Sequence, residues 1–140
     1  MAENSICHPF SHPVIKRFTE NIDKTISSFS IVLSSNILKH FSPDGRAVYM
    51  KGNLVFVDSS VLEIAMFVSE TPEAVKIEKY RLHYMKGNGK ILFRYDDAPH
   101  HPEIASYPHH KHTPDNVIPS TETSLKDVLK EISAIIIGKP

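Results

Sequence analysis

The sequence predicts an α+β fold: a mostly antiparallel sheet of about five strands, with an N-terminal and a C-terminal helix packed on its apolar face. Three observations predict it. Two segments with helical spacing of apolar residues lie near the two ends of the chain. Between them lie short runs rich in β-branched and aromatic residues, separated by turn sequences. No helical segment alternates with these runs, which argues against a parallel sheet.

The first predicted helix follows Ser11, a candidate N-cap, and has Pro13 in its first turn. Apolar residues recur every three or four positions at Ile15, Phe18, Ile22, Ile26 and Phe29. The segment 28–38 can continue this helix or form a strand with Phe29, Ile31 and Leu33 on one side, and we favour the strand.

The middle of the chain reads as strands joined by turns. Residues 42–45, Ser-Pro-Asp-Gly, are typical of a tight turn. We predict strands over 47–57, 61–68, 75–85 and 91–95. Residues 97–119 contain five of the ten prolines and show no apolar periodicity, so we expect a long loop there.

The closing segment predicts a second helix. Ser124 and Asp127 form a variant capping box, and apolar residues keep helical spacing until Gly138. These residues are Leu125, Val128, Leu129, Ile132, Ile135 and Ile136.

The Asn-Gly pair at 88–89 predicts a hairpin with a two-residue loop. This loop pairs residues whose numbers add to an odd total, which separates apolar from polar side chains. One face then carries Tyr80, Leu82, Tyr84, Ile91, Phe93 and Tyr95. The other face carries Arg81, His83, Arg94 and Asp96.

Composition limits the protein's class. The length fits one domain, residues 1–140. A lone cysteine, Cys7, cannot form an internal disulfide and favours the cytoplasm. No apolar run approaches the roughly 18 residues of a membrane span, and no secretory signal precedes the first helix.

The 16 basic and 16 acidic residues cancel, so the net charge indicates binding to neither nucleic acid nor membrane. Locally, however, the strip 76–96 carries six basic residues against two acidic ones and could meet a phosphate backbone.

Five of the nine histidines fall within residues 94–112. Imidazole exchanges protons near neutral pH and binds metals, so this cluster suggests acid–base chemistry or a metal site. In an extended chain residues i and i+2 project together, so His110 and His112 can converge whereas His109 points away.

Two chemical readings of the cluster stay open. In the first, His110 and His112 chelate a divalent transition metal such as zinc, completed by His101 or His83 and a carboxylate such as Asp96. In the second, no cofactor is needed: histidines act as general acid and base on RNA, whose own 2′-hydroxyl is the nucleophile. Arg81 or Arg94 then stabilises the charge on phosphorus, with Asp96 or Asp97 orienting a histidine.

The ordinary alternative is that these residues form only a solvated sheet face. An Arg-Asp pair across a hairpin is more often a modest cross-strand contact than a catalytic device. The density of imidazole nevertheless favours a functional cluster over this alternative.

The stretch 75–119 resembles the TumE family of toxin-antitoxin toxins. The family pattern is a Tyr-x-x-His strand, a hairpin, an Arg-aromatic-Asp-Asn-Ala-Pro-His-His-Pro run and an aromatic-Pro-His-His-x-His run. The matching residues here are Tyr80, His83, Arg94, Tyr95, Asp96, Ala98, Pro99, His100, His101, Pro102, Tyr107, Pro108, His109, His110 and His112. One departure is Asp97, where the family commonly has asparagine. The resemblance implies a small cytoplasmic toxin restrained by an antitoxin, often a helix-turn-helix protein.

The leading hypothesis is a toxin that cleaves RNA without a metal. We expect catalysis from His83, Arg94, Asp96, His101, His110 and His112, and substrate binding by Lys79, Arg81, Lys90 and Tyr107. A metal-dependent hydrolase using His101, His110 and His112 is one alternative. The other is a non-enzymatic protein whose histidine loop docks a partner as the imidazoles gain charge near pH 6. The identity of the antitoxin and the formation of a homodimer stay open.

Overall fold

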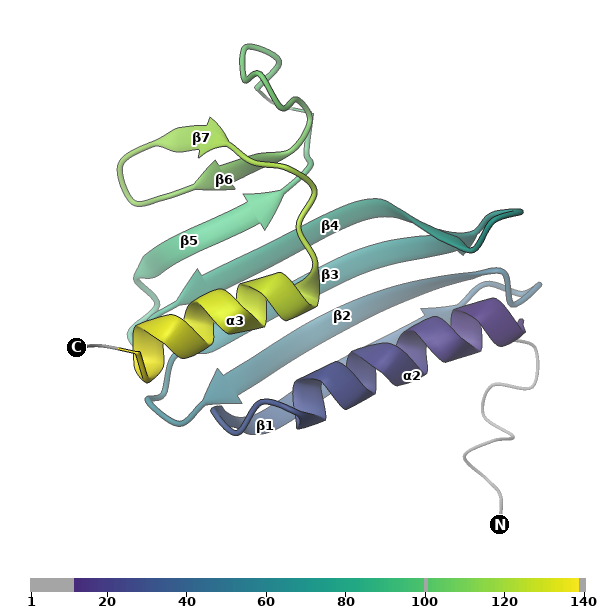
Figure 1. Cartoon of the computed structure of the whole chain (residues 1–140), viewed down its shortest axis with the longest axis horizontal. Coiled ribbons are helices and arrows are strands. Elements are labelled where there is room, and N and C mark those ends of the chain that lie inside the picture. Colours follow the sequence, from purple (N-terminus) through teal and green to yellow (C-terminus); the bar gives the residue numbers. More distant parts are fainter. Residues whose placement is uncertain (1–11, 100, 139–140) are drawn as a thin grey trace.

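Seven antiparallel strands follow one another across the sheet in chain order, and both helices lie on one face of it (Figure 1). These elements belong to residues 12–99 and 101–138, which the computed structural model describes. They are α2 (Pro13–Ser27), β1 (Val32–Phe41), β2 (Ala47–Phe56), β3 (Val61–Glu70), β4 (Val75–Met85), β5 (Ile91–Asp96), β6 (His110–His112), β7 (Val117–Pro119) and α3 (Leu125–Ile136). The predicted α+β class is confirmed.

Both predicted helices are present. Pro13 opens α2, where its missing N–H costs nothing. The N-cap of α2 is His12, whose side chain makes no capping hydrogen bond; Ser11, the predicted cap, lies outside the described residues. In α3 the prediction is confirmed, because the Ser124 hydroxyl accepts a hydrogen bond from the Asp127 N–H at 3.1 Å. Neither α2 nor α3, the helices of the described ranges, is long and apolar enough to cross a membrane.

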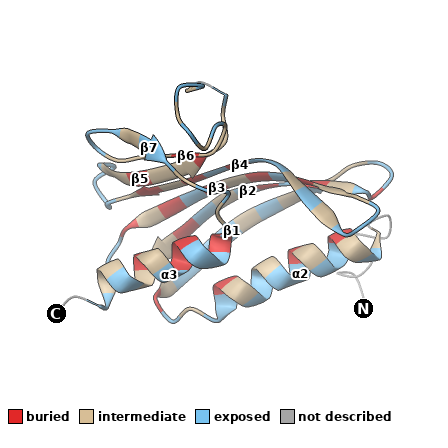
Figure 2. Cartoon of the chain, turned by 45° about the horizontal axis from the view of Figure 1, so that its top comes forward, coloured by how far each residue is buried: buried red, intermediate tan, exposed pale blue. Residues whose placement is uncertain are grey.

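The core fills the space between the helices and one face of the sheet. Along β3, Leu62, Ile64, Met66 and Val68 are buried, whereas the residues between them are partly or fully exposed. This two-residue period is that of a strand with one covered face, and Figure 2 shows the same alternation along the neighbouring strands. The helices supply Ile15, Ile26, Leu125, Val128, Leu129 and Ile132 to the core. No helix of residues 12–99 or 101–138 lies on the other face of the sheet, and the candidate site lies there.

The predicted strand count was too low, because the segment predicted as a loop contributes β6 and β7. Each has three residues, too short to show a two-residue period in the sequence. Strand β6 pairs with the free edge of β5, and a turn at 113–116 returns the chain as β7. Pro119 is tolerated because β7 is an edge strand, where one missing N–H breaks no ladder.

The predicted two-residue hairpin loop between β4 and β5 was wrong, although most of the register was right. Lys86 N–H donates to the Lys90 carbonyl at 2.9 Å, and Gly89, with a φ of 89°, occupies the left-handed position of a three-residue loop. A register shift then restores the odd pairing, so that Tyr84 faces Phe93 while Ile91 faces Met85. Ile91 is therefore the one misplaced residue of the predicted apolar face.

The segment 28–38 becomes a strand only from Val32. Ser28 caps α2, and Ile31 is buried before the strand begins. A register shift between Val32 and Ser34 leaves Leu33 68% exposed, so Leu33 and Ile31 do not share a side as predicted.

Candidate functional site

The candidate site consists of two rows of side chains that cross strands β4, β5 and β6. Directly opposed residues of antiparallel strands project from the same face. One row holds His83, Arg94 and His112, and the next holds Arg81, Asp96 and His110. Both rows lie on the face away from the helices, because the alternating residues Leu82, Tyr84 and Phe93 belong to the core. Strand pairing thus brings the histidine segment onto the polar face of the hairpin.

Asp96 is the centre of these contacts. Its Oδ2 lies 2.9 Å from Nε of Arg94, and its Oδ1 lies 2.7 Å from Nε2 of His110. The N–H of Ala98 also donates to Oδ1 at 3.1 Å. Only 4% of Asp96 and 2% of His110 are exposed. A carboxylate at this depth needs such partners, because burial removes its hydration.

The contacts of His110 fix where its protons lie. Its Nδ1 lies 2.8 Å from the Pro108 carbonyl, which can only accept, so Nδ1 carries a hydrogen. On the other side of the ring, Nε2 and Oδ1 of Asp96 are too close for two bare acceptors. One proton therefore lies between them, and the pair is an imidazolium with a carboxylate or a neutral imidazole with a carboxylic acid. Both ring nitrogens of His110 are already occupied.

His112 has the opposite character. Nη2 of Arg94 donates to Nε2 of His112 at 3.0 Å, and a guanidinium cannot accept, so Nε2 presents its lone pair. The pKa of His112 is lowered, first by burial and then by the positive charge of Arg94; Asp96 acts in the opposite direction. The side chain remains 20% exposed. His112 is thus a neutral imidazole within reach of solvent.

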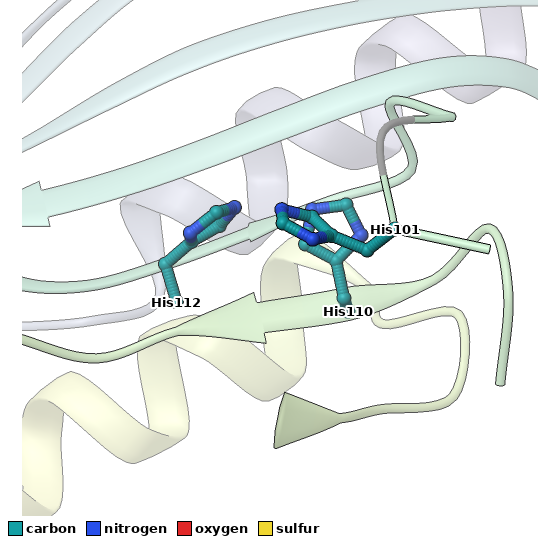
Figure 3. A group of neighbouring side chains, drawn as sticks. All are labelled: His101, His110 and His112. Carbon is teal, nitrogen blue, oxygen red and sulfur yellow. The ribbon is translucent and has the colours of Figure 1, made fainter. Parts of the chain in front are cut away.

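His101 completes a group of three imidazoles (Figure 3). Its ring centre lies 5.3 Å from that of His110 and 5.7 Å from that of His112. Nδ1 of His101 lies 3.1 Å from Oε2 of Glu103, so Nδ1 carries the hydrogen and Nε2 is the nitrogen that can exchange a proton. The side chain is 30% exposed.

The same three histidines could hold a metal ion, since one nitrogen from each lies within 4.8 Å of the others. Two nitrogens bound to one tetrahedral zinc ion, each at about 2.0–2.1 Å, lie about 3.4 Å apart. The rings would therefore have to move closer together. His110 would also have to give up its contact with Asp96 or with the Pro108 carbonyl. Nε2 of His112 would have to leave Arg94 unless Nδ1 became the ligand.

The remaining predicted residues lie in different places. His83 pairs directly with Arg94 and is half-buried; among the described residues its Nδ1 has no hydrogen-bond partner. The pKa of His83 is lowered, mainly by burial. The negative charge of Glu63 raises the pKa, and the positive charges of Arg94 and Arg81 lower it further. Lys90 lies in the hairpin loop at the far end of β4 and β5, away from the cluster.

A cleft of about 610 Å³ opens beside Asp96. Its lining includes Lys79, Arg81 and Tyr107, three of the four predicted substrate-binding residues, but not Lys90. It also includes Tyr49 and Phe67, from β2 and β3, which the sequence reading did not select. Both alternate with core residues, a pattern that could have placed them on the open face once the strand pairing was known.

A family model for the toxin TumE matches residues 22–136 of the chain, most of its length. The chain belongs to the TumE toxin family. It is therefore the toxin component of a toxin-antitoxin system, and an antitoxin is its partner. No curated protein and no solved structure matches the chain significantly.

The family match extends the resemblance from the histidine motifs to all seven strands of the sheet and α3. Asp97 is the position at which the sequence departs from the family pattern given above, which has asparagine there. Oδ1 of Asp97 accepts a hydrogen bond from the Tyr80 N–H at 3.1 Å. An asparagine oxygen can accept the same bond, so Asp97 satisfies the local backbone of β4 as asparagine would.

His109, also within the TumE motif, is turned away from the cluster as predicted. Its Nδ1 lies 3.0 Å from the hydroxyl of Tyr80, and the two rings stack with centres 5.8 Å apart. His100 lies outside the described residues. The imidazole group that the described part of the chain assembles is therefore His101, His110 and His112.

Proposed function

We propose that this toxin cleaves RNA by metal-independent acid–base catalysis at the cluster of Arg94, Asp96, His101, His110 and His112. The observation that carries the proposal is the difference between two neighbouring imidazoles. His112 is neutral and accessible, whereas His110 is buried and shares a proton with Asp96. An accessible group can exchange a proton with a substrate. A buried group cannot, and it can only hold the accessible groups in position.

The roles follow from this division. His112 accepts the proton of a 2′-hydroxyl after Arg94 turns from its Nε2 toward the phosphate. The 2′-oxygen attacks the adjacent phosphorus and the bond to the 5′-oxygen breaks. His101, in its protonated form, gives a proton to that leaving oxygen, and the products are a 2′,3′-cyclic phosphate and a 5′-hydroxyl. Arg94 stabilises the charge on the phosphorane oxygens.

Asp96 and His110 are positioning residues in this scheme. Asp96 forms an ion pair with the guanidinium of Arg94 on its Nε side, while Nη2 is directed at His112. His110 fixes the carboxylate from the other side. His83 extends the row behind Arg94, where a neutral imidazole avoids repulsion with the guanidinium.

The test is incubation of toxin purified without an affinity tag with total RNA, with and without a chelator. We expect cleavage in both samples and cyclic phosphate ends on the products. Arg94→Ala and His112→Ala should remove the activity and the toxicity while the proteins still fold. No cleavage in either sample, together with harmless overexpression, would defeat the proposal.

A metal-dependent hydrolase is the second candidate, supported by the three converging nitrogens of His101, His110 and His112. A bound zinc ion would activate water as the nucleophile. Loss of activity in chelator, with stoichiometric metal in the untreated protein, would favour this candidate. A third possibility, partner binding without catalysis, predicts an antitoxin complex that survives alanine at all three histidines and no RNA cleavage.

We further propose that the toxin acts in the cytoplasm and that its antitoxin is a helix-turn-helix protein. The single cysteine supports the first proposal and the family resemblance the second. Identification of the protein that co-purifies with the toxin from its native host tests the antitoxin type.

A further inference from the structure

The cleft beside Asp96 gathers the exposed phenylalanine and tyrosine rings. Among residues 12–99 and 101–138, three such side chains are exposed: Tyr49, Phe67 and Tyr107, at 38%, 37% and 46%. All three line this cleft. Exposed aromatic rings are costly on a surface with no partner, and their concentration at one place indicates a binding site.

The strand register explains the shape of the cleft. Tyr49 faces Phe67 across β2 and β3, and Phe67 faces Lys79 across β4, so these three form one row. In the next row Ala65 stands opposite Arg81, which stands opposite Asp96. Because the side chain of Ala65 is a single methyl group, it leaves a depression in the sheet surface between Arg81 and the rings of Tyr49 and Phe67. The loop before β6 brings Tyr107 to the same cleft.

The charges of the cleft are arranged for an anion next to the rings. Neither Lys79 nor Arg81 forms an ion pair with any described residue, so both are available to a ligand. Of the three acidic residues of the lining, Asp96 and Glu78 lie beside basic residues outside the lining, whereas Asp97, among the described residues, accepts only from a backbone N–H. Asp96 contacts Arg94 and His110, and Asp97 accepts from Tyr80. Glu78 accepts from Ser69 and lies 3.7 Å from Lys76.

We propose that this cleft binds single-stranded RNA, with unstacked bases on Tyr49, Phe67 and Tyr107 and the phosphate backbone along Lys79 and Arg81. Aromatic rings with adjacent cations on an open sheet face suit this ligand, because every base stacks and every linkage carries a charge. Arg81 stands opposite Asp96, which contacts Arg94 and His110, so the cleft adjoins the cluster and RNA held there lies next to it. The inference rests on the proposed RNA cleavage and names how the substrate is held.

The experiment measures binding separately from cleavage. The probe is a fluorescein-labelled, mixed-sequence 2′-O-methyl oligoribonucleotide, which lacks the attacking hydroxyl and cannot be cleaved by the proposed route. Fluorescence anisotropy gives its dissociation constant for the wild type and three variants. Phe67→Ser removes one ring, and Ala65→Leu fills the cleft without touching the cluster. Leu38→Ala, an exposed apolar residue of β1 outside the lining, is the control.

We expect Phe67→Ser and Ala65→Leu each to weaken binding about tenfold or more, the effect of losing one stacked base, with Leu38→Ala unchanged. Equal affinity in all four proteins, or no binding by the wild type, would overturn the inference. So would cleft variants that lose the antitoxin but keep the oligonucleotide, since the cleft would then be a protein-docking groove. If the wild type binds as expected but cuts no RNA, the cleft stands and the proposed cleavage falls.

Discussion

His110 and Asp96 stand directly opposite each other on β6 and β5, with Nε2 and Oδ1 2.7 Å apart and both side chains nearly fully buried. This contact links the histidine segment to the hairpin that carries Arg94. The proton that the two groups share is also shielded from water, so water cannot take the place of either partner. Removal of either partner leaves the other polar group buried and without its main contact, which costs far more than the loss of a surface pair.

Asp96→Asn should therefore lower the free energy of unfolding by about 3 kcal/mol, the usual cost of breaking a buried charged pair. Urea unfolding of the two proteins measures it. Asp23→Asn is the matched control, because Asp23 pairs with Lys39 at 2.6 Å but is half-exposed, and its loss should change stability little. If Asp96→Asn lowered the free energy of unfolding no more than the control does, the contact between Asp96 and His110 would not be a stabilising buried pair.

The two neighbouring histidines of β6 should respond differently to glutamine. His112→Gln removes an accessible base, so the rate of cleavage of a labelled oligoribonucleotide should fall by about 10²–10⁴ with little change in unfolding. His110→Gln should lower both the rate and the stability, because it breaks the contact with Asp96. His109→Gln is the control, because the His109 ring stacks on Tyr80 outside the cluster. This variant should keep the wild-type rate of cleavage. If His109→Gln lowered the rate of cleavage as much as His112→Gln, catalysis would not depend specifically on this cluster.

Much of this architecture could be predicted because it depends on local rules. The caps and apolar spacing placed α3, and the alternation along β4 and β5 placed Arg94 and Asp96 on the polar face. The spacing of His110 and His112 showed that they share a direction. These features need only the geometry of one helix or one strand.

What the sequence did not reveal depends on contacts between distant segments. Strand β6 exists because the unpaired edge of β5 is available to it, and three residues carry no periodic signal of their own. Tyr49 and Phe67 reach the cleft only through the register of β2, β3 and β4. The burial of His110 and the exposure of His112 likewise depend on what folds over them, so the sequence could not distinguish a positioning residue from a base.

Stability should depend on pH through His83 and His112, whose pKa values are both below the ordinary 6.5 in the folded protein. As the pH falls below 6.5, the unfolded chain takes up protons that the folded protein does not. The free energy of unfolding should therefore decrease as the pH falls from about 7 to about 5.5, before most carboxylates titrate.

Urea unfolding at several pH values in this window gives the slope. The double variant His83→Gln/His112→Gln should have a flatter slope than the wild type, because glutamine does not titrate. His40→Gln, at an exposed position of β1, should leave the slope as it is. A double variant with the wild-type slope would show that these two rings do not carry the effect.

Two lysines distinguish the cleft from the general basic strip of the hairpin. Lys79 lines the cleft, whereas Lys90, which sequence reasoning also assigned to the substrate, lies in the loop at the far end. Each phosphate contact on a single strand contributes about 0.7 to the slope of log affinity against log salt concentration. Lys79→Gln should reduce the slope for the 2′-O-methyl oligonucleotide by about that amount, and Lys90→Gln should leave it nearly unchanged. Anisotropy titrations between about 50 and 200 mM salt measure it. Equal reductions for both variants would mean that RNA follows the whole hairpin and that the cleft does not define its path.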